Sequence, residues 1–309
     1  MGIAEDSRGA RRLKHRLEHA VVRRLLRSFA ARPLDEAIER GARLGRIWHA
    51  LDRRHRRLAA ANIRLGLGHD AASASRVACA SFESIGRTLA EFALAAERPD
   101  ELLARVDFED GPRLRQVLAA GRGLLLVSGH CGNWELLGAR VGREIPLTSI
   151  ARPLANPLVD QTVTDLRRAA GIRTVASDDA AREVLRTLRR GEAVAVLLDQ
   201  SASRGERVFV NFLGRPAATN FGLALLALKS GAPVLPGFSA RGADGRHRVW
   251  IGEPIAPADS ADRGTRLGVT TARYTAAIEA WVRRHPDQWF WVHDRWKRTP
   301  GPDDPVFAP

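Results

Sequence analysis

The sequence is poor in the residues on which small secreted and metal-binding proteins depend. It has two cysteines, one methionine and one tyrosine among 309 residues. The spacing of Cys79 and Cys131 fits neither a disulfide framework nor a metal-binding motif. We therefore expect a reducing compartment and no bound metal.

The sequence also lacks a long apolar run. No segment approaches the roughly 20 apolar residues that span a bilayer, and the first residues do not follow the pattern of a secretory signal. The acidic residues Glu5, Asp6 and Glu18 argue against a mitochondrial transit peptide. We expect the protein to stay on the cytosolic side.

What the chain has in excess is positive charge. Lysine and arginine number 49 and aspartate and glutamate 35, a formal net charge of +14, and 45% of the residues are hydrophobic. This composition can form a substantial core, either as one large domain or as a domain with an appendage. The charge predicts an anionic partner, which can be nucleic acid, anionic lipid or an acidic carrier protein.

The first part of the chain is predicted to be helical and basic. An apolar stripe surrounded by arginines recurs at steps of four, at Leu13, Leu17, Val21, Leu25 and Phe29. Such a stripe fits a helix lying in the interface of an anionic membrane, and it equally fits a basic helix packed on the domain. Pro33 ends this helix, a second arginine-rich helical region covers residues 34–67, and a further helix covers residues 71–97.

From residue 121 the sequence alternates apolar runs with helical segments, which predicts an α/β fold with a mixed, largely parallel sheet flanked by helices. The tail after residue 300 is expected to be irregular. The candidate strands are residues 123–128, 146–151, 172–176, 193–198, 233–239 and 247–252. The candidate helices are residues 156–170, 179–190, 218–230 and 265–285.

A histidine lies at the strand-to-helix turn that follows the first of these strands. Gly129 and Gly132 allow the backbone to turn there, and Asn133 is a candidate N-cap for the next helix. Glu135 falls in the first turn of that helix, where the helix dipole favours a carboxylate. In that geometry Glu135 can bind one imidazole nitrogen of His130 and leave the other free as a general base.

Four stretches of the chain together resemble one known family. The segment His130-Cys131-Gly132-Asn133-Trp134-Glu135 is similar to the His-x4-Asp/Glu motif of the bacterial lipid A biosynthesis acyltransferases. Three further stretches resemble the same family in the same order. They are residues 152–160 with Arg167 and Gly171, Asp199-Gln200 with residues 208–217 and 231–234, and residues 286–293 with Arg295-Trp296-Lys297.

The resemblance implies an enzyme of the His-x4-Asp/Glu superfamily with a glycerolipid-acyltransferase-like fold. In such an enzyme the motif histidine deprotonates a hydroxyl, which attacks the thioester of an acyl carrier. It assigns His130 as the base and Glu135 as its orienting partner, and it expects Arg167, Asp199 and Arg295 to support the same site. The acyl carrier protein or coenzyme A thioester is then a co-substrate, and no cofactor is implied. We expect the chain to consist of a basic, helical membrane-associating region, residues 1–60, and an acyltransferase domain, residues 61–309.

Several other residues are candidates with two interpretations each. Arg152 and Arg215 can contact a substrate phosphate or carrier, because arginine binds phosphate through two hydrogen bonds, or they can be solvated loop residues. Asn133 is a further substrate-binding candidate. Cys131 invites an acyl-cysteine mechanism, although direct attack by the hydroxyl needs no covalent relay. His293 can act as a second acid or base, or it can be a packed structural residue.

The predicted function is transfer of a fatty acyl chain to a hydroxyl of a membrane glycolipid, either a lipid A precursor or another acceptor such as a phosphatidylinositol mannoside. Members of the family commonly begin with an apolar anchoring helix, whereas this region is basic, so attachment to the cytoplasmic face of a bacterial inner membrane is expected to be peripheral. The alternative from another class is a non-enzymatic module that binds nucleic acid or anionic membrane through the charge of +14. No nucleic-acid recognition motif accompanies that charge.

Overall fold

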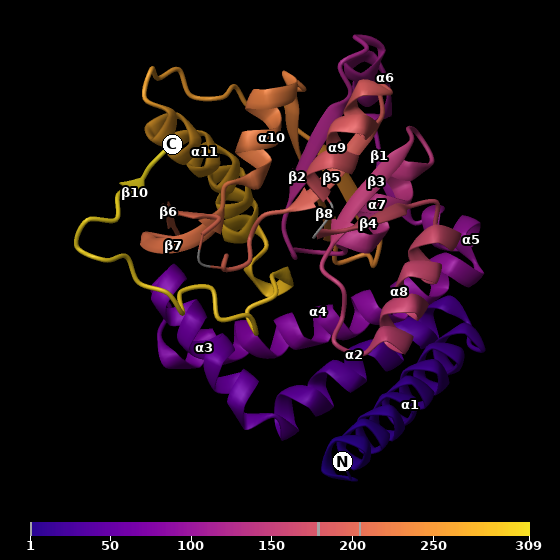
Figure 1. The fold of residues 1–309 in the computed structure, drawn as a ribbon. Helices are drawn as coiled ribbons and strands as arrows, with labels where there is room; N and C mark the ends of the chain where they lie inside the picture. Colours follow the sequence, from indigo (N-terminus) through magenta and orange to yellow (C-terminus); the bar gives the residue numbers. More distant parts are fainter. Residues whose placement is uncertain (1, 178–179, 204) are drawn as a thin grey trace.

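The amino-terminal third of the protein is a layer of helices in which α4 runs below the main sheet and α1 and α2 pack against α4 (Figure 1). The structure, a computed structural model, describes residues 2–177, 180–203 and 205–309, with residues 2–8 described by their backbone alone. The helices of this layer are α1 (Gly2–Ala30), α2 (Leu34–Leu51), α3 (Arg53–Leu67), α4 (Ala71–Glu97) and α5 (Pro99–Leu103). The division expected after residue 60 falls inside α3.

The expected helix over residues 34–67 is two helices. Asp52 lies between them with φ −88° and ψ 83°, outside the helical region. Its side chain accepts a hydrogen bond from the backbone amide of His55 at 3.0 Å, which caps α3. The apolar periodicity continues across the break, which is why the sequence did not reveal it.

The apolar stripe of α1 serves two different surfaces. Leu25 is partly buried and Phe29 is fully buried, and both pack into the core below the sheet. Leu13, Leu17 and Val21 are 60, 60 and 68% exposed. Residues four apart are offset by about 40° on a helix, so a stripe at steps of four winds from the packed face to the open face.

The main sheet has seven strands in the order β1-β9-β8-β2-β5-β3-β4, and only the β8–β9 pair is antiparallel. The mixed, largely parallel sheet and its six predicted strands are confirmed, and the short β1 was not predicted. Its strands are β1 (Val106–Phe108), β2 (Leu124–Ser128), β3 (Leu147–Ala151), β4 (Arg173–Ala176), β5 (Ala193–Leu197), β8 (Val234–Arg241) and β9 (His247–Ile251).

Helices flank this sheet, and the predicted ones are found, whereas the helix Gly111–Ala119 was not predicted. The helix expected over residues 179–190 is found from Ala180, and residue 179 lies outside the described residues. The helices are α6 (Gly111–Ala119), α7 (Trp134–Gly142), α8 (Pro157–Ala169), α9 (Ala180–Arg189), α10 (Gly222–Ser230) and α11 (Arg263–Arg284). Among the described residues, no helix combines the length and the apolar character needed to cross a bilayer.

A second, three-stranded sheet lies beside α11 and was not predicted (Figure 1). Its strands are β6 (Arg207–Phe212), β7 (Arg215–Asn220) and β10 (Val306–Phe307), in the order β10-β6-β7. β7 occupies the first residues of the helix expected over residues 218–230, so that α10 begins at Gly222. The carboxy-terminal tail is therefore not wholly irregular. A short 3-10 helix, η2 (Pro286–Gln288), leads from α11 into this tail.

The fold brings four strand ends to one edge of the main sheet. β8, β2, β5 and β3 are consecutive and parallel, so their carboxyl ends meet at the same edge. Ligands of α/β sheets bind at this edge. The residues at or just beyond these ends are Arg241, His130, Asp199 and Arg152.

Candidate active site

His130 and Asp199 form a hydrogen-bonded pair at the carboxyl ends of the neighbouring strands β2 and β5. The Nδ1 of His130 lies 2.8 Å from Oδ1 of Asp199, and the backbone amide of His130 donates to Oδ2 of the same carboxylate at 2.8 Å. The indole of Trp289 donates to Oδ2 at 2.7 Å, which gives the carboxylate its third hydrogen bond. We call His130 and Asp199 the dyad.

Asp199 is ionised in this setting. Its side chain is 2% exposed, and burial alone would raise its pKa, but the adjacent His130 and the three hydrogen bonds outweigh burial and lower the pKa to about 2. An ionised carboxylate only accepts hydrogen bonds, so Nδ1 of His130 must carry the proton. In the neutral imidazole the other ring nitrogen, Nε2, then has the lone pair that a general base requires.

The open nitrogen of His130 faces a partly exposed site. The side-chain nitrogen of Gln200, an exposed residue, lies 3.5 Å from Nε2. Two aromatic rings flank the imidazole, Trp134 at 5.0 Å and Phe290 at 5.9 Å between ring centroids. The histidine side chain is 20% exposed, which leaves room for a reacting group to approach Nε2.

Glu135, the acidic residue of the His-x4-Glu motif, binds an arginine and not His130. Arg167 on α8 donates from Nη2 to Oε1 of Glu135 at 2.6 Å and from Nε to Oε2 at 3.0 Å. The prediction that Glu135 orients the imidazole through a direct hydrogen bond is therefore wrong. Glu135 lies on α7, whose first turn leads away from the turn that holds His130, whereas β5 ends beside β2 and delivers Asp199 to Nδ1.

Comparison with known proteins identifies the family of the chain. The model of the bacterial lipid A biosynthesis acyltransferase family matches residues 10–298. The chain belongs to that family. The family members are acyltransferases, so the protein is an enzyme that transfers acyl groups, and the alternative of a non-enzymatic binding module does not hold.

Three relatives show how far the similarity extends. The chain is 32% identical to a lipid A biosynthesis lauroyltransferase of Escherichia coli (strain K12) over 225 residues, 71% of each protein. It is 27% identical to a lipid A biosynthesis palmitoleoyltransferase of the same strain over 264 residues, 84% of each protein. It is 31% identical to a phosphatidylinositol mannoside acyltransferase of Mycobacterium tuberculosis (strain CDC 1551 / Oshkosh) over 232 residues, 71% of this chain and 69% of the relative.

The structure places the two candidate phosphate-binding arginines, Arg152 and Arg215, in different parts of the fold. Arg152 is exposed at the carboxyl end of β3, and among the described residues no hydrogen bond or ion pair holds it. Arg215 is exposed on β7 and donates to the backbone oxygen of Leu65 on α3 at 3.4 Å. Arg152 therefore lies on the same edge as the dyad, whereas the contact of Arg215 is with the helical layer.

Arg295 is a buried structural cation. It is fully buried and donates to the backbone oxygen of Ala218 at 2.7 Å and to Oγ1 of Thr219 at 2.6 Å. Its guanidinium carbon lies 5.2 Å from the centre of the Phe212 ring. Burial lowers the pKa of Arg295 to about 10, against the attraction of Asp199. Arg295 holds β7 and acts on the dyad only through its charge.

Asn133 and Cys131 are both removed from substrate. Asn133 is 1% exposed and caps α7 by accepting a hydrogen bond from the amide of Leu136 at 2.9 Å, so its candidacy as a substrate contact is wrong while its role as N-cap is confirmed. Cys131 is also 1% exposed, and burial together with the charge of Asp199 raises the pKa of its thiol well above the usual value. A buried thiol of this kind is a poor nucleophile.

His293 has a structural contact. Its Nε2 accepts a hydrogen bond from the backbone amide of Ser201 at 2.9 Å, two residues beyond Asp199. Burial, helped by nearby Lys297, lowers the pKa of His293 to about 4. The imidazole is therefore neutral near pH 7 and fixes the segment that follows the dyad aspartate.

Sequence analysis missed a buried charged group beside the motif. Glu91 on α4 is 1% exposed and binds Arg241, His247 and Asn133. One signal was present, since Glu91 interrupts an otherwise apolar run in the second half of α4. Among the described residues, no group of three or more His, Cys, Asp or Glu side chains is placed to hold a metal ion.

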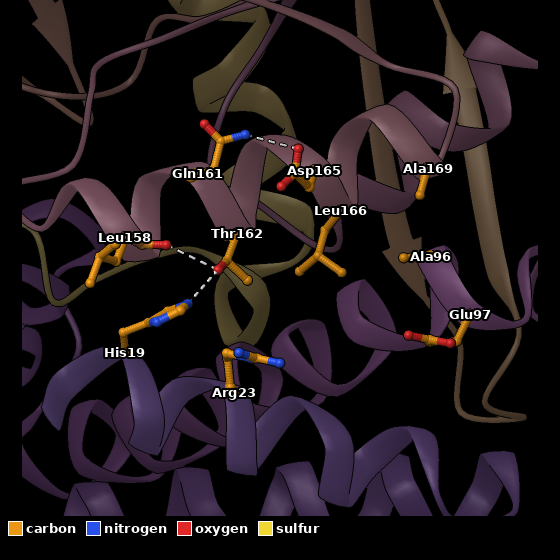
Figure 2. A pocket seen from close by; sticks show the side chains of 10 residues that line it. All are labelled: His19, Arg23, Ala96, Glu97, Leu158, Gln161, Thr162, Asp165, Leu166 and Ala169. Atoms are coloured by element: carbon orange, nitrogen blue, oxygen red, sulfur yellow. Dashed lines mark hydrogen bonds between the residues drawn. The ribbon is translucent and has the colours of Figure 1, made fainter. Parts of the chain in front are cut away.

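A separate hollow of about 470 Å³ lies between α1 and α8. Figure 2 shows His19 and Arg23 of α1 facing Thr162 and Leu166 of α8 across it, with Nε2 of His19 at 3.0 Å from Oγ1 of Thr162. None of its lining residues contacts the dyad. The hollow thus lies at the contact between the basic helix α1 and α8, the helix that carries Arg167.

Proposed function

We propose that the protein transfers a fatty acyl chain from a thioester of acyl carrier protein or coenzyme A to a hydroxyl of a membrane glycolipid. The observation that carries this proposal is the dyad at the carboxyl edge of the sheet, with one imidazole nitrogen bound to an ionised carboxylate and the other open. The thioester enters as a co-substrate, and no cofactor takes part.

The chemistry proposed for the dyad is direct transfer. Nε2 of His130 takes the proton of the acceptor hydroxyl as its oxygen attacks the thioester carbonyl carbon. The carbon–sulfur bond then breaks, and the proton on Nε2 passes to the leaving thiolate. Asp199 keeps the imidazole in the required tautomer and stabilises the imidazolium that forms between the two steps. Gln200 must release its contact with Nε2 when the hydroxyl arrives.

The pair of Glu135 and Arg167 supports this site by position. It joins the first turn of α7 to the last turn of α8 through two charge-assisted hydrogen bonds. α7 follows the turn of His130 and α8 follows β3, so the pair fixes relative to each other two helices that begin at the carboxyl edge. Arg152, exposed and unpaired among the described residues at that edge, is the proposed contact for an acceptor phosphate.

The acceptor class follows from the relatives. Two of them are described as enzymes of lipid A biosynthesis and one as an enzyme of phosphatidylinositol mannosides. Both acceptors are glycolipids with anionic groups, which suits an enzyme with a net charge of +14. We propose a lipid A precursor as the first candidate, because the relative with the highest of these three identities acts in that pathway, and a phosphatidylinositol mannoside as the second.

The proposed location is the cytoplasmic face of a bacterial inner membrane, with peripheral attachment through α1. The exposed residues Leu13, Leu17 and Val21 are apolar, and exposed cations stand among and beside them. Such a face is suited to an anionic interface, where each nearby cation adds about 1 kcal/mol of attraction. The opposite face of α1 is bound to the domain: Asn156, just before α8, donates to the side chain of Glu18 at 2.9 Å.

The decisive test offers purified protein a labelled acyl thioester and each of the two acceptors in mixed micelles. Acyl transfer to one acceptor by the wild type, and its loss in His130→Ala, is the expected result. Acylation of neither acceptor by the wild type would reject the glycolipid proposal, and full activity of His130→Ala would reject the assigned base. Donor competition between acyl carrier protein and coenzyme A thioesters then identifies the carrier.

A further inference from the structure

Glu91, in the second half of α4, is a buried carboxylate that the transfer chemistry does not use. It is 1% exposed, and its carboxylate accepts hydrogen bonds from the side chains of Arg241, His247 at 2.9 Å and Asn133 at 2.8 Å. Burial alone would raise its pKa, but His247 and Arg241 outweigh burial and lower it. Glu91 is therefore charged in the folded protein, with a donor on each oxygen.

The three donors come from three different parts of the fold. Arg241 is the last residue of β8, His247 is the first residue of β9, and Asn133 belongs to the motif turn, which we define as residues 129–133. One carboxylate thus joins the helical layer, the sheet and the turn that carries His130. β8 is the neighbour of β2 on the side opposite to β5, so Glu91 and Asp199 approach the motif turn from opposite sides.

The orientation of Asn133 depends on Glu91. Its Oδ1 accepts the amide of Leu136, so its side-chain NH2 group must point away from α7 and toward Oε2 of Glu91. Without that acceptor, Asn133 would hold a buried NH2 group with no hydrogen-bond partner, which destabilises this arrangement of the turn. The carboxylate therefore fixes the side chain that sets where α7 begins.

Backbone contacts also fix the position of the motif turn. Gly132 has φ +64°, and a Cβ at this position would lie 1.7 Å from the backbone oxygen of Ser239 on β8. The amide of Gly132 donates to the backbone oxygen of Gln288 at 2.8 Å, and the side chain of Gln288 pairs with the backbone of Arg241 at 2.9 and 3.0 Å. Arg241 is thus bound at its backbone by Gln288 and at its side chain by Glu91.

A buried ionic cluster of this kind adds little to stability compared with apolar packing of the same volume, because each charge loses its hydration. What the cluster provides is a defined geometry for the groups that it joins. We propose that Glu91 is a positioning residue for acyl transfer, which through Asn133 holds the motif turn so that His130 meets Asp199. This inference rests on the function proposed for His130.

The test reverses donor and acceptor in the hydrogen bond between Asn133 and Glu91. In Glu91→Gln the amide cannot satisfy Asn133, Arg241 and His247 together, and in Asn133→Asp two carboxylates face each other. The double variant Glu91→Gln/Asn133→Asp restores the bond with donor and acceptor reversed, and it keeps the cap and the total charge. We expect each single variant to lower kcat about 10- to 100-fold with little change in KM, and the double variant to recover most of the loss.

Hydrogen exchange supplies a readout that needs no substrate. Amides in residues 130–137 are expected to exchange faster in both single variants and to return to the wild-type rate in the double variant, while α11 stays protected in all of them. The milder Asn133→Ser keeps a capping side chain, loses the tie to Glu91, and is expected to show the same local change with an intact fold. The matched control is Asp107→Asn, which removes an exposed ion pair between Asp107 on β1 and Arg246, the residue just before β9.

The outcomes separate this inference from the proposed function. Wild-type kcat and wild-type exchange in Asn133→Ser would overturn the positioning role, as would a double variant that stays as slow as the single variants. A wild-type enzyme that acylates neither glycolipid would reject the proposed function. Amide hydrogen exchange in residues 130–137 of the variants would still show, in that case, whether Glu91 holds the motif turn.

Discussion

Arg167 donates two hydrogen bonds to the carboxylate of Glu135, at 2.6 and 3.0 Å, and so binds the motif glutamate to α8 while Asp199 takes the place beside His130. The two carboxylates therefore have separate tasks. Asp199 binds the ring of the proposed base, and Glu135 joins α7 to α8.

Asp199→Asn should remove the proton acceptor on Nδ1 and favour the wrong tautomer of His130. By analogy with triads in which the orienting aspartate is amidated, we expect kcat to fall by about 10³- to 10⁴-fold with KM nearly unchanged. Steady-state kinetics with saturating acyl donor measures the effect. Asp259→Asn, at an exposed position, is the control and should leave kcat at the wild-type value. A loss below tenfold in Asp199→Asn would contradict the assigned role.

Glu135→Gln and Arg167→Gln should behave as one unit. Their side chains are 10 and 19% exposed, so removing either charge leaves its partner poorly solvated, at a cost of about 3 kcal/mol in the free energy of unfolding. We expect the double variant to lose less than the sum of the two single losses, measured by urea denaturation. On the same helix, Asp165→Asn breaks an exposed pair with Arg168 and should cost less than about 1 kcal/mol. Simple additivity of the two losses would show that the pair is not coupled.

His293 should make the protein less stable in mild acid. Its pKa is about 4 in the folded protein and near 6.5 when unfolded, so between these values the unfolded chain binds a proton that the folded protein does not. Stability therefore falls as pH drops from 6.5 to 4, by about 2 kcal/mol after allowance for partial exposure.

The variant His293→Gln checks this pH dependence, because its side-chain oxygen can accept the amide of Ser201 without a titrating group. Urea denaturation at several pH values between 4 and 7.5 should show a shallower loss of stability in this variant than in the wild type. His15→Gln on α1 is the matched control and should follow the wild-type curve. Identical curves for wild type and His293→Gln would refute the prediction.

The exposed apolar face of α1 should bind anionic vesicles. Replacing Leu13, Leu17 and Val21 together by serine removes three side chains, each worth about 1.5–3 kcal/mol when fully buried in an apolar phase, so we expect at least about a 100-fold loss of partitioning. Sedimentation with phosphatidylglycerol vesicles measures it. Binding should also weaken from 0.1 to 1 M salt, as the Debye length falls from about 10 to 3 Å. The control for the substitutions is Val306→Ser, at a 44% exposed position of β10, which should bind vesicles as the wild type does. Wild-type binding that does not change with salt would count against attachment by charge.

Much of the main sheet could be predicted because its strands are buried on both faces and appear in the sequence as apolar runs. β2 is buried at all five positions and β8 at seven of eight. β7 begins with an exposed arginine and proline and contains only alanines as apolar residues, so nothing in its pattern separated it from the helix that follows. Its pairing with β6 depends on the chain reversal at residues 213–214, where Leu213 and Gly214 have positive φ.

The site could be predicted only as a set of residues and not as a set of contacts. The sequence places Asp199 after a strand and His130 after another, but their hydrogen bond requires β5 to lie next to β2, a neighbour relationship between segments some 70 residues apart. Glu135 was nearer in sequence and therefore the natural partner to expect. Sequence distance favoured Glu135, and strand order decided for Asp199.

Gly132 has no functional group, yet it limits the site as strictly as the residues that react. Because Gly132 has no side chain, the motif turn can lie directly against the backbone of Ser239 on β8. A methyl group there would have to displace a strand of the main sheet. Isosteric replacements can mimic a carboxylate or an amide, but no replacement is smaller than glycine. The position of the His130 ring therefore depends on the space that glycine leaves at residue 132, and we expect this position to tolerate no other residue.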